Sequence, residues 1–194
     1  MNKTLAIIAG EPNSIASEII FKSWKQRKKY SYNPLFIIGN YNLFKIQKKK
    51  LNYKIKIKKI DNNFKSIDLK GNELPIYDID YNQKKAFEKI SSKSNKYILN
   101  CFEIGIKLVK SNRISGFINC PISKEHLFKN KYQGITEFLS KKFQKKGEEV
   151  MLIYNNKLSV CPITTHLPLK KVSKEISKIK IIKKVKVINS FYKK

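Results

Sequence analysis

The stretch that decides the fold is TLAIIAGEPNS, residues 4–14, which passes from an apolar run through a loop into a helix start. Residues 4–9 have the length and composition of a buried β-strand, and residues 10–13 are predicted to form a loop after it. Ser14 can cap a helix that extends to about residue 29. A strand followed at once by an amphipathic helix is the repeating unit of α/β proteins. The predicted buried face of this helix contains Ile15, Ile19, Ile20 and Trp24.

The same alternation of short β-branched runs with helical stretches continues along the chain. It predicts an α/β protein with a largely parallel or mixed sheet. The predicted strands are residues 35–38, 53–60, 75–79, 116–119, 150–154 and 158–163, and the last two are joined across Asn155-Asn156. The predicted helices are residues 41–50, 94–111, 123–129 and 136–145, followed by one helix after Pro168 with Val172, Ile176, Ile179 and Ile182 on one side.

The composition is strongly basic, with a formal charge of +28 at pH 7. Such a charge would suit a nucleic acid, because lysine and arginine neutralise phosphates. However, Arg27 and Arg113 are the only arginines among 42 basic residues, and lysine lacks the planar fork that reads guanine edges. The lysines are also scattered through every segment. We therefore expect no specific nucleic-acid partner, although weak attraction to polyanions is expected.

Two further features of composition bear on location. No apolar run approaches the length needed to cross a bilayer, and the first nine residues lack the cleavage site of a signal peptide. No membrane association is expected, and a cytoplasmic location is predicted. The three cysteines, Cys101, Cys120 and Cys161, have neither the close pairing of a zinc site nor the density of a disulfide scaffold. They are predicted to be core thiols.

Three segments lie at the ends of predicted strands, where α/β proteins usually place ligands. In the first, residues 9–14, a loop that runs into a helix start can hold an anion on free backbone N–H groups. An ordinary turn is the alternative explanation. The second, residues 117–124, places Lys124 on the first turn of a helix, where its charge opposes the helix dipole and suggests an anionic partner. Chance placement in a lysine-rich chain is the alternative there.

The third segment is TTHLPL, residues 164–169. A histidine between hydroxyl residues and a proline turn is a candidate metal ligand or acid–base group, so His166 is singled out. One histidine does not make a metal site, which needs about three protein ligands. A purely structural role for this histidine stays open on these residues alone. The other histidine, His126, lies in a short polar helix and is predicted to be a surface residue.

Taken in order, five segments resemble the signatures of the 4-hydroxythreonine-4-phosphate dehydrogenases. They are GEP at 10–12, NCPISK at 119–124, GITEF at 134–138, VML at 150–152 and TTHLPL at 164–169. The last is the most specific. The resemblance runs from Leu5 to about Phe191 but corresponds to the N-terminal part of the family's longer sequence. Residues 1–194 are therefore expected to form the N-terminal portion of such an enzyme, with a subdivision near 110–120 and the C-terminal portion absent.

The resemblance also implies roles for individual residues. It implies that His166 binds a catalytic divalent metal, such as Zn, Mg or Co, and that Thr136 contacts the phosphorylated amino-acid substrate. Lys124 is a further candidate for substrate binding. Ile135 stands where the family has a histidine, so the hydrogen-bond donor of that imidazole is missing. Substrate binding is expected to be weakened or remodelled at this position.

For the whole enzyme, the resemblance implies an α/β fold with a mixed sheet and flanking helices, like that of isocitrate and isopropylmalate dehydrogenases. It implies NAD-dependent oxidation and decarboxylation of 4-phosphooxy-threonine in pyridoxal 5'-phosphate biosynthesis, in a homodimer with shared sites. The remaining metal and substrate ligands and most of the NAD site are expected beyond this chain, which alone is expected to be inactive. A non-catalytic folded remnant and, with less support, a basic nucleic-acid-binding protein are the alternatives.

Overall fold

The chain folds into two compact units, Met1–Lys129 and Asn130–Lys194. The computed structural model describes residues 4–29, 34–129, 131–132, 134–144, 149–165 and 167–193. The boundary between the units therefore follows Lys129. The first unit holds the sheet and the segments around Glu11 and Lys124, whereas the second holds Thr136 and the segment around position 166.

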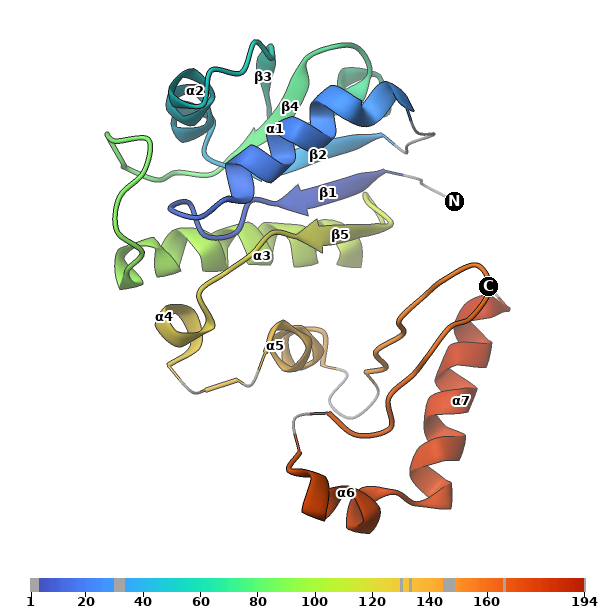
Figure 1. Ribbon diagram of the computed structural model, residues 1–194. Coiled ribbons are helices and arrows are strands. Elements are labelled where there is room, and N and C mark those ends of the chain that lie inside the picture. Colours follow the sequence, from blue (N-terminus) through green and yellow to red (C-terminus); the bar gives the residue numbers. More distant parts are fainter. Residues whose placement is uncertain are drawn as a thin grey trace. The chain divides into compact units, whose positions relative to one another are not determined.

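The first unit is built on a five-stranded sheet in the order β3-β4-β2-β1-β5 (Figure 1). Every pairing in this sheet is parallel, and Leu5 lies opposite both Leu35 and Gly116. The predicted α/β class is confirmed, and the sheet of the described residues is parallel, not mixed. The strands are β1 (Leu5–Ile8), β2 (Leu35–Gly39), β3 (Ile57–Ile60), β4 (Leu74–Asp78) and β5 (Gly116–Asn119).

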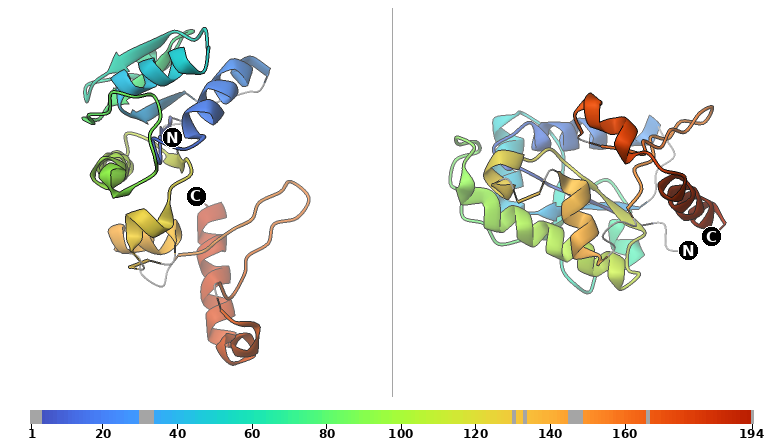
Figure 2. Two further views of the ribbon diagram at one scale, coloured as in Figure 1. Left: turned by 60° about the vertical axis from the view of Figure 1, so that its left-hand side comes forward. Right: turned by 90° about the horizontal axis from the view of Figure 1, so that it is seen from below.

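Helices cover both faces of this sheet, α1 and α2 on one face and α3 on the other (Figures 1 and 2). Parallel strands need crossover connections of this kind, and a sheet covered on both faces explains why its strands are apolar throughout. The α-helices of the first unit are α1 (Ala16–Gln26), α2 (Tyr41–Lys50), α3 (Asn95–Lys110) and α4 (Lys124–Phe128). The short 3-10 helices are η1 (Arg27–Lys29), η2 (Ser66–Leu69) and η3 (Ser92–Ser94).

The core between α1, α2 and the sheet is aromatic. Phe21 packs edge-on against Phe44 with ring centroids 5.7 Å apart. Trp24, 4% exposed, is buried in the same cluster, and the Arg27 guanidinium lies 4.1 Å from its ring centroid. The predicted buried face of α1 was only partly right, because Ile15 and Ile19 are 62% and 41% exposed. The helix begins at Ala16, so Ile15 lies before it. The residues that face the core include Ala16, Ile20 and Trp24, which leaves Ile19 at the edge of the buried face.

The opposite face of the sheet packs on α3. Cys101 and Phe102 are fully buried there, and Gly105 lets the helix approach closely, since a Cβ at that position would lie 3.1 Å from the Ile8 side chain. Burial raises the pKa of the Cys101 thiol to about 12, so this cysteine is a protonated core residue. Burial likewise raises the pKa of Cys120 to about 11. Both thiols fit the predicted core role.

The second unit consists of helices and loops. It contains α5 (Ile135–Lys142), α6 (Leu169–Glu175) and α7 (Lys178–Tyr192). The predicted hairpin is reduced to one antiparallel bridge between Ile153 and Val160, closed by two backbone hydrogen bonds of 2.8 and 2.9 Å. The single helix predicted after Pro168 is two helices, because the Ser177 side chain accepts a hydrogen bond from the Lys180 N–H and starts α7 anew.

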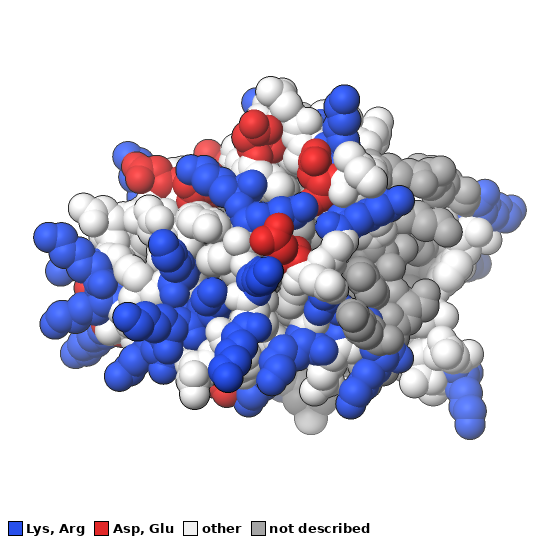
Figure 3. All heavy atoms as spheres, turned by 90° about the horizontal axis from the view of Figure 1, so that it is seen from above, with Lys and Arg blue, Asp and Glu red and all other residues white. Residues whose placement is uncertain are grey.

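Lysine and arginine residues occur throughout the sequence. On the face drawn in Figure 3, lysine and arginine side chains lie over most of the described surface, with acidic groups between them at several points. This distribution does not mark out a single basic stripe on that face. Among the described residues, no helix combines the length and the apolar character needed to cross a bilayer.

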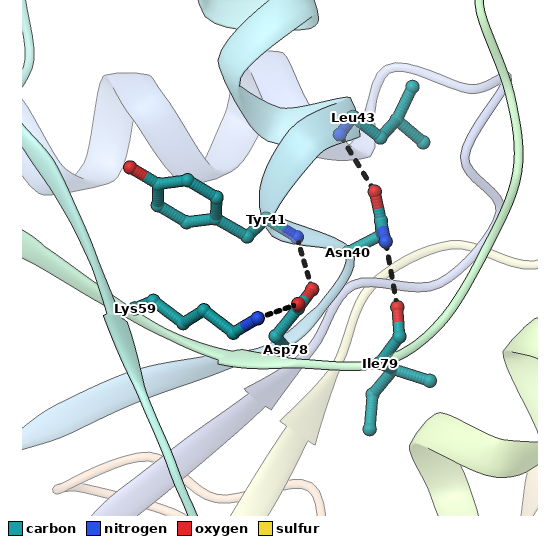
Figure 4. A network of polar contacts seen from close by, with 6 residues as sticks. All are labelled: Asn40, Tyr41, Leu43, Lys59, Asp78 and Ile79. Carbon is teal, nitrogen blue, oxygen red and sulfur yellow. Dashed lines mark hydrogen bonds and ion pairs between the residues drawn. The ribbon is translucent and has the colours of Figure 1, made fainter.

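A polar network fixes the carboxyl ends of β2 and β4 at the start of α2 (Figure 4). Asn40 caps α2 by accepting a hydrogen bond from the Leu43 N–H at 2.8 Å, and its amide donates to the Ile79 carbonyl at 2.9 Å. Asp78 accepts from the Tyr41 N–H at 2.8 Å and forms an ion pair with Lys59 at 2.6 Å. The Asn40 side chain, directly after β2, and the Asp78 side chain at the end of β4 therefore hold the helix N-terminus in place.

Candidate functional site

The first two strand-end segments meet in the first unit. Gly10 has a φ of +73°, which favours glycine, and a Cβ there would lie 2.4 Å from the Pro121 carbonyl oxygen. The Glu11 N–H donates to the same carbonyl at 2.9 Å. The loop after β1 is thereby fastened to the loop after β5 at the carboxyl edge of the sheet. Only glycine fits this close approach of two backbones.

Glu11 is a buried carboxylate that the sequence reasoning missed. The residue is 1% exposed, and each carboxylate oxygen accepts a hydrogen bond. Oε1 accepts from the Asn13 N–H at 3.1 Å, and Oε2 accepts from the Ser94 hydroxyl at 2.8 Å. Ser94 directly precedes α3, but its hydroxyl donates to Glu11 and makes no cap hydrogen bond. A buried carboxylate needs such partners to offset its lost hydration.

The predicted anion site on the loop of residues 9–14 is not supported. The N–H groups of Glu11, Asn13 and Ser14 already donate to the Pro121 carbonyl, the Glu11 carboxylate and the Glu11 carbonyl. The Ala16 N–H donates to the Ser14 hydroxyl at 3.1 Å. The buried negative charge of Glu11 also repels an anion. The ordinary turn, given above as the alternative, fits these contacts.

Side-chain amides tie this loop to the segment before α3. The Asn13 side-chain oxygen accepts from the Gln83 amide at 2.9 Å and from the Glu88 N–H at 2.8 Å. Gln47, 1% exposed, donates to the carbonyl oxygens of Pro12 and Ala86 at 2.7 and 2.9 Å. No periodicity in residues 61–93 signals these contacts, since they join single polar residues far apart in sequence.

The second segment places Lys124 at the start of α4, where it is exposed. This helix has only five residues, so the argument from the helix dipole is weak at this position. The preceding hydroxyl of Ser123 lies 2.7 Å from His126 Nδ1, and the His126 carbonyl accepts from the Asn95 amide at 2.7 Å. His126 is therefore half-buried and hydrogen-bonded, where the sequence predicted a surface residue.

A pocket of about 330 Å³ lies within the second unit. It brings Thr136, on the first turn of α5, to the same cavity as Thr164 and Thr165. Ile135 is the first residue of α5 and is half-buried. His166 lies outside the described residues. The pocket is lined by Thr136, Glu137, Glu149, Met151, Ile163, Thr164, Thr165, Leu167, Glu175, Lys180, Lys183 and Lys184.

The acidic side chains of this pocket have defined surroundings. Glu175 pairs with Lys180 at 2.5 Å, and this hydrogen bond lowers the pKa of Glu175. Glu149 accepts from the Ser140 hydroxyl at 2.9 Å, and Glu137 lies in the first turn of α5. Within the described ranges of the chain, no three histidine, cysteine, aspartate or glutamate side chains come together as a metal-binding group.

Comparison with known proteins assigns the chain to a family. The family model described as "Pyridoxal phosphate biosynthetic protein PdxA" matches residues 31–194. A 4-hydroxythreonine-4-phosphate dehydrogenase of Aquifex aeolicus is 33% identical over 196 residues, which cover 97% of this chain and 57% of that protein. A D-threonate 4-phosphate dehydrogenase of Salmonella typhimurium is 25% identical over 197 residues, covering 99% of this chain and 59% of that protein.

The fold is shared with a solved relative. The crystal structure of a 4-hydroxythreonine-4-phosphate dehydrogenase from Klebsiella pneumoniae superposes with a TM-score of 0.83 at 22% identity. The superposition covers 59% of that protein and 100% of this chain. The chain thus spans somewhat more than half the length of the relatives it matches. With the family match extending over most of its residues, the chain belongs to the family of the pyridoxal phosphate biosynthetic protein PdxA.

Proposed function

We propose that this chain is the N-terminal portion of a 4-hydroxythreonine-4-phosphate dehydrogenase and carries part of its substrate site. The proposed reaction is the NAD-dependent oxidation and decarboxylation of 4-phosphooxy-threonine in pyridoxal 5'-phosphate biosynthesis. Family membership and relatives with this name support the proposal. The observation that carries it is the pocket of the second unit, in which Thr136 and the Thr164-Thr165 pair line one cavity.

The substrate contact in this proposal is the hydroxyl of Thr136. The residue is exposed on the first turn of α5, so a ligand in the pocket can reach its hydroxyl. A hydroxyl that donates to a phosphate oxygen forms a charge-assisted hydrogen bond, which is stronger than a neutral one. Ile135 offers no donor, so the site loses the contact that an imidazole would make. Lys124 is retained as a further candidate for contact with an anionic group.

His166 is proposed as one ligand of a divalent metal, Zn, Mg or Co. It lies outside the described residues, and the described ranges of the chain contain no group of three candidate ligands. The described residues therefore do not fit a complete metal site. NAD is proposed as the hydride acceptor, and no residue of this chain is assigned to binding it. We further propose that the whole enzyme is a cytoplasmic homodimer. Its proposed fold is that of isocitrate and isopropylmalate dehydrogenases, and the parallel sheet with helices on both faces supports the broad α/β class of this fold.

The test of the substrate contact is calorimetric titration of the chain with 4-phosphooxy-L-threonine. Thr136→Val removes the hydroxyl at nearly constant volume and is expected to weaken binding about tenfold, the loss of one hydrogen bond to a charged group. Thr136→Ser is the matched control, because it keeps the hydroxyl and should bind within about twofold of the wild type. Equal binding by the valine and serine variants would remove Thr136 from the substrate site.

Turnover by the chain alone is expected to be negligible. Among the described residues no three-ligand metal group forms, and a catalytic metal site needs about three protein ligands. The measurement is NADH formation with 4-phosphooxy-L-threonine, NAD and Zn²⁺, Mg²⁺ or Co²⁺. Robust NADH production that is lost on chelation would contradict this expectation.

A non-catalytic folded member of the family is the second candidate, favoured by Ile135 at the position of the family's histidine. The calorimetric titration with 4-phosphooxy-L-threonine distinguishes the two candidates. A wild-type chain that does not bind 4-phosphooxy-L-threonine at all would favour it.

A further inference from the structure

We propose that a groove on the first unit, between α2 and the segment that joins β4 to α3, is a docking site for an acidic peptide segment with an apolar anchor. The groove has a volume of about 640 Å³ and shares no residue with the pocket of the second unit. It is lined by Ile46, Lys49 and Lys50 of α2 and by Lys85, Ala86 and Phe87 of the joining segment. We call it the α2 groove, and it goes beyond the proposed function.

Buried polar contacts hold the two walls of the α2 groove together. Gln47, which follows Ile46 in α2, is 1% exposed and donates to the Ala86 carbonyl at 2.9 Å. On the other wall, the buried Gln83 amide donates to the Lys85 carbonyl at 2.9 Å. Buried amides need such partners, so these hydrogen bonds favour one arrangement of the walls. The groove is therefore preformed, and a ligand does not have to order it first.

Apolar side chains lie between the lysines of the groove. Ile46 and Phe87 are half-buried, one on each wall, and Ala86 is buried. Apolar surface that is still partly exposed gains free energy when another apolar group covers it. A single leucine or phenylalanine side chain of a ligand would make this contact, as the anchors of protein interfaces do.

The charges of the groove have one sign. Among the described residues, none that lines the groove is acidic. Within the described ranges of the chain, the ammonium groups of Lys49, Lys50 and Lys85 take part in no ion pair. Another cavity of the first unit, of about 370 Å³, differs because Asp61 and Asp68 line it beside its lysines. A ligand in the α2 groove would therefore have to supply the negative charge itself.

The end of α2 explains only part of this charge pattern. Lys49 and Lys50 lie in the last turn of the helix, where the partial negative charge of the helix end favours cations. Lys85 belongs to another segment and gains nothing from that helix end, yet its exposed side chain lines the same groove. Local helix stability therefore does not account for a cationic rim that is built from both walls.

The combination of apolar side chains and ammonium groups selects the class of ligand. Aspartate and glutamate supply carboxylates for the lysines, and an apolar residue between them supplies the anchor. A nucleic acid suits the groove less well, because Phe87 alone among its apolar residues offers a surface on which a base can stack. A second copy of this chain, with a charge of +28, would be repelled by the rim.

The experiment is NMR titration of the isotope-labelled whole chain with a peptide of sequence EDLFDE. The salt concentration is about 0.15 M, at which the Debye length is about 8 Å and general attraction between charges is screened. The backbone signals of the lining residues are expected to shift and to give the dissociation constant. A wild-type chain whose groove signals do not respond to this peptide would overturn the proposal.

Two further peptides separate charge from apolar contact. EDGSDE keeps the carboxylates but lacks the anchor, and QNLFNQ keeps the anchor but lacks the charges. EDLFDE is expected to bind at least about fivefold more tightly than either, because each contributes only part of the contact. Equal binding of EDLFDE and EDGSDE would show general attraction of acidic peptides to a basic surface, which contradicts a specific groove.

Matched lysine variants test the rim. Lys49→Gln/Lys85→Gln removes one charge from each wall and is expected to weaken binding of EDLFDE about fivefold. Lys45→Gln/Lys84→Gln removes the same charge from exposed positions of the same two elements that do not line the groove. This control should change binding less than about twofold, since charges outside the contact are screened. The proposal falls if both double variants weaken binding equally.

The apolar contact has its own variant. Phe87→Ala is expected to weaken binding of EDLFDE about fivefold and to leave binding of EDGSDE unchanged. The NMR fingerprint shows whether this variant stays folded, and the lysine variants, at exposed positions, test the groove independently of it. Displacement of EDLFDE by an oligothymidylate from the same residues would assign the groove to nucleic acid instead.

The outcome is separate from that of the proposed function. Lys49→Gln/Lys85→Gln is expected to leave the binding of 4-phosphooxy-L-threonine unchanged, because neither lysine lines the pocket of the second unit. A failure of the α2 groove would therefore leave the proposed substrate contact at Thr136 intact.

Discussion

Gly10 is the residue at which two strand-end loops approach most closely. Its positive φ and its distance to the Pro121 carbonyl act together, so a side chain would be strained and would also clash with a backbone atom. Gly71 separates these two effects. Its φ is +102°, but a Cβ there would meet nothing within 4 Å. The two glycines thus form a natural pair for measuring the cost of the contact alone.

We predict that Gly10→Ala destabilises the first unit more than Gly71→Ala does. Both variants carry the cost of a positive φ, about 1 kcal/mol, whereas only Gly10→Ala must also displace the loop after β5. The added loss is expected to be about 1–3 kcal/mol, the usual range for forcing extra atoms into a packed site. Urea denaturation measures both variants. Equal midpoints would mean that the loops separate without cost.

The burial of Glu11 shows why single residues of the site escaped the sequence reasoning. Glutamate is rarely buried, and a loop between a strand and a helix usually lies at the surface. Its partner, Ser94, lies 83 positions away and carries the ordinary sign of a helix cap. Neither residue lies in a local sequence pattern that predicts its contact with the other. The roles of His166, Thr136, Ile135 and Lys124 remain predictions.

At the scale of elements, periodicity located the regular structure well. The helix predicted at residues 41–50 is α2, Tyr41–Lys50, and the strand predicted at 116–119 is β5, Gly116–Asn119. Both have clear punctuation at their ends. The apolar spacing after Pro168 predicted one helix, but a polar residue divides it. Ser177 caps a second helix, α7, within an unbroken apolar pattern. The sequence pattern also failed in the segment around the Ile153–Val160 bridge, where alternation alone did not produce extended strands.

We predict that the cap of α2 is a strong local determinant of stability. Asn40→Ala removes both the hydrogen bond from the Leu43 N–H and the donor to the Ile79 carbonyl, and it leaves buried groups without partners. The expected loss in the free energy of unfolding is about 2–4 kcal/mol. Asn42, two residues further on, is exposed within the same helix. Asn42→Ala should change stability by less than about 0.5 kcal/mol.

Urea denaturation of the two asparagine variants provides the comparison. A similar midpoint for Asn40→Ala and Asn42→Ala would show that the network in Figure 4 adds little to stability. The Asn40 backbone N–H also donates to the buried Tyr97 hydroxyl of α3 at 3.0 Å. This contact links the cap of α2 to α3, so a backbone shift at the cap is expected to reach α3 as well as α2.

At the scale of the molecule, a buried thiol and a buried phenol that stay protonated are expected to make the free energy of unfolding fall at alkaline pH. Burial raises the pKa of Cys101 from 9.0 to about 12 and that of Tyr97 well above 10. Since the folded pKa exceeds the unfolded one, the contribution is complete below the unfolded pKa and is lost as pH rises through the folded pKa. We expect stability to fall from about pH 9 upward, by up to about 1.4 kcal/mol per pH unit for each such group.

The test compares the slopes of stability against pH. Cys101→Ala removes one titrating group, so its slope between about pH 9 and 11 should be shallower than that of the wild type. Ile98→Val is a control that perturbs the same helix without a titratable group and should keep the wild-type slope. Identical slopes in the wild type and Cys101→Ala would contradict the protonated thiol.

The charge of the whole chain leads to a prediction about nucleic acids. Binding of DNA or RNA is expected to be weak, indifferent to sequence and abolished by moderate salt, because every contact would be a lysine–phosphate ion pair. Thr136→Ala and His166→Ala should leave it unchanged. Fluorescence anisotropy across a salt series checks this. Sequence-selective binding that survives physiological ionic strength would favour the nucleic-acid-binding alternative.

The burial of Trp24 in the first unit has a spectroscopic consequence. Trp24 is the only tryptophan of the chain, and it lies buried in the first unit. Its intrinsic emission therefore reports on residues 1–129 and is blind to residues 130–194. Far-ultraviolet circular dichroism records both units, because α5, α6 and α7 contribute to the signal. Melting midpoints that differ between emission and dichroism would mean that the two units unfold separately.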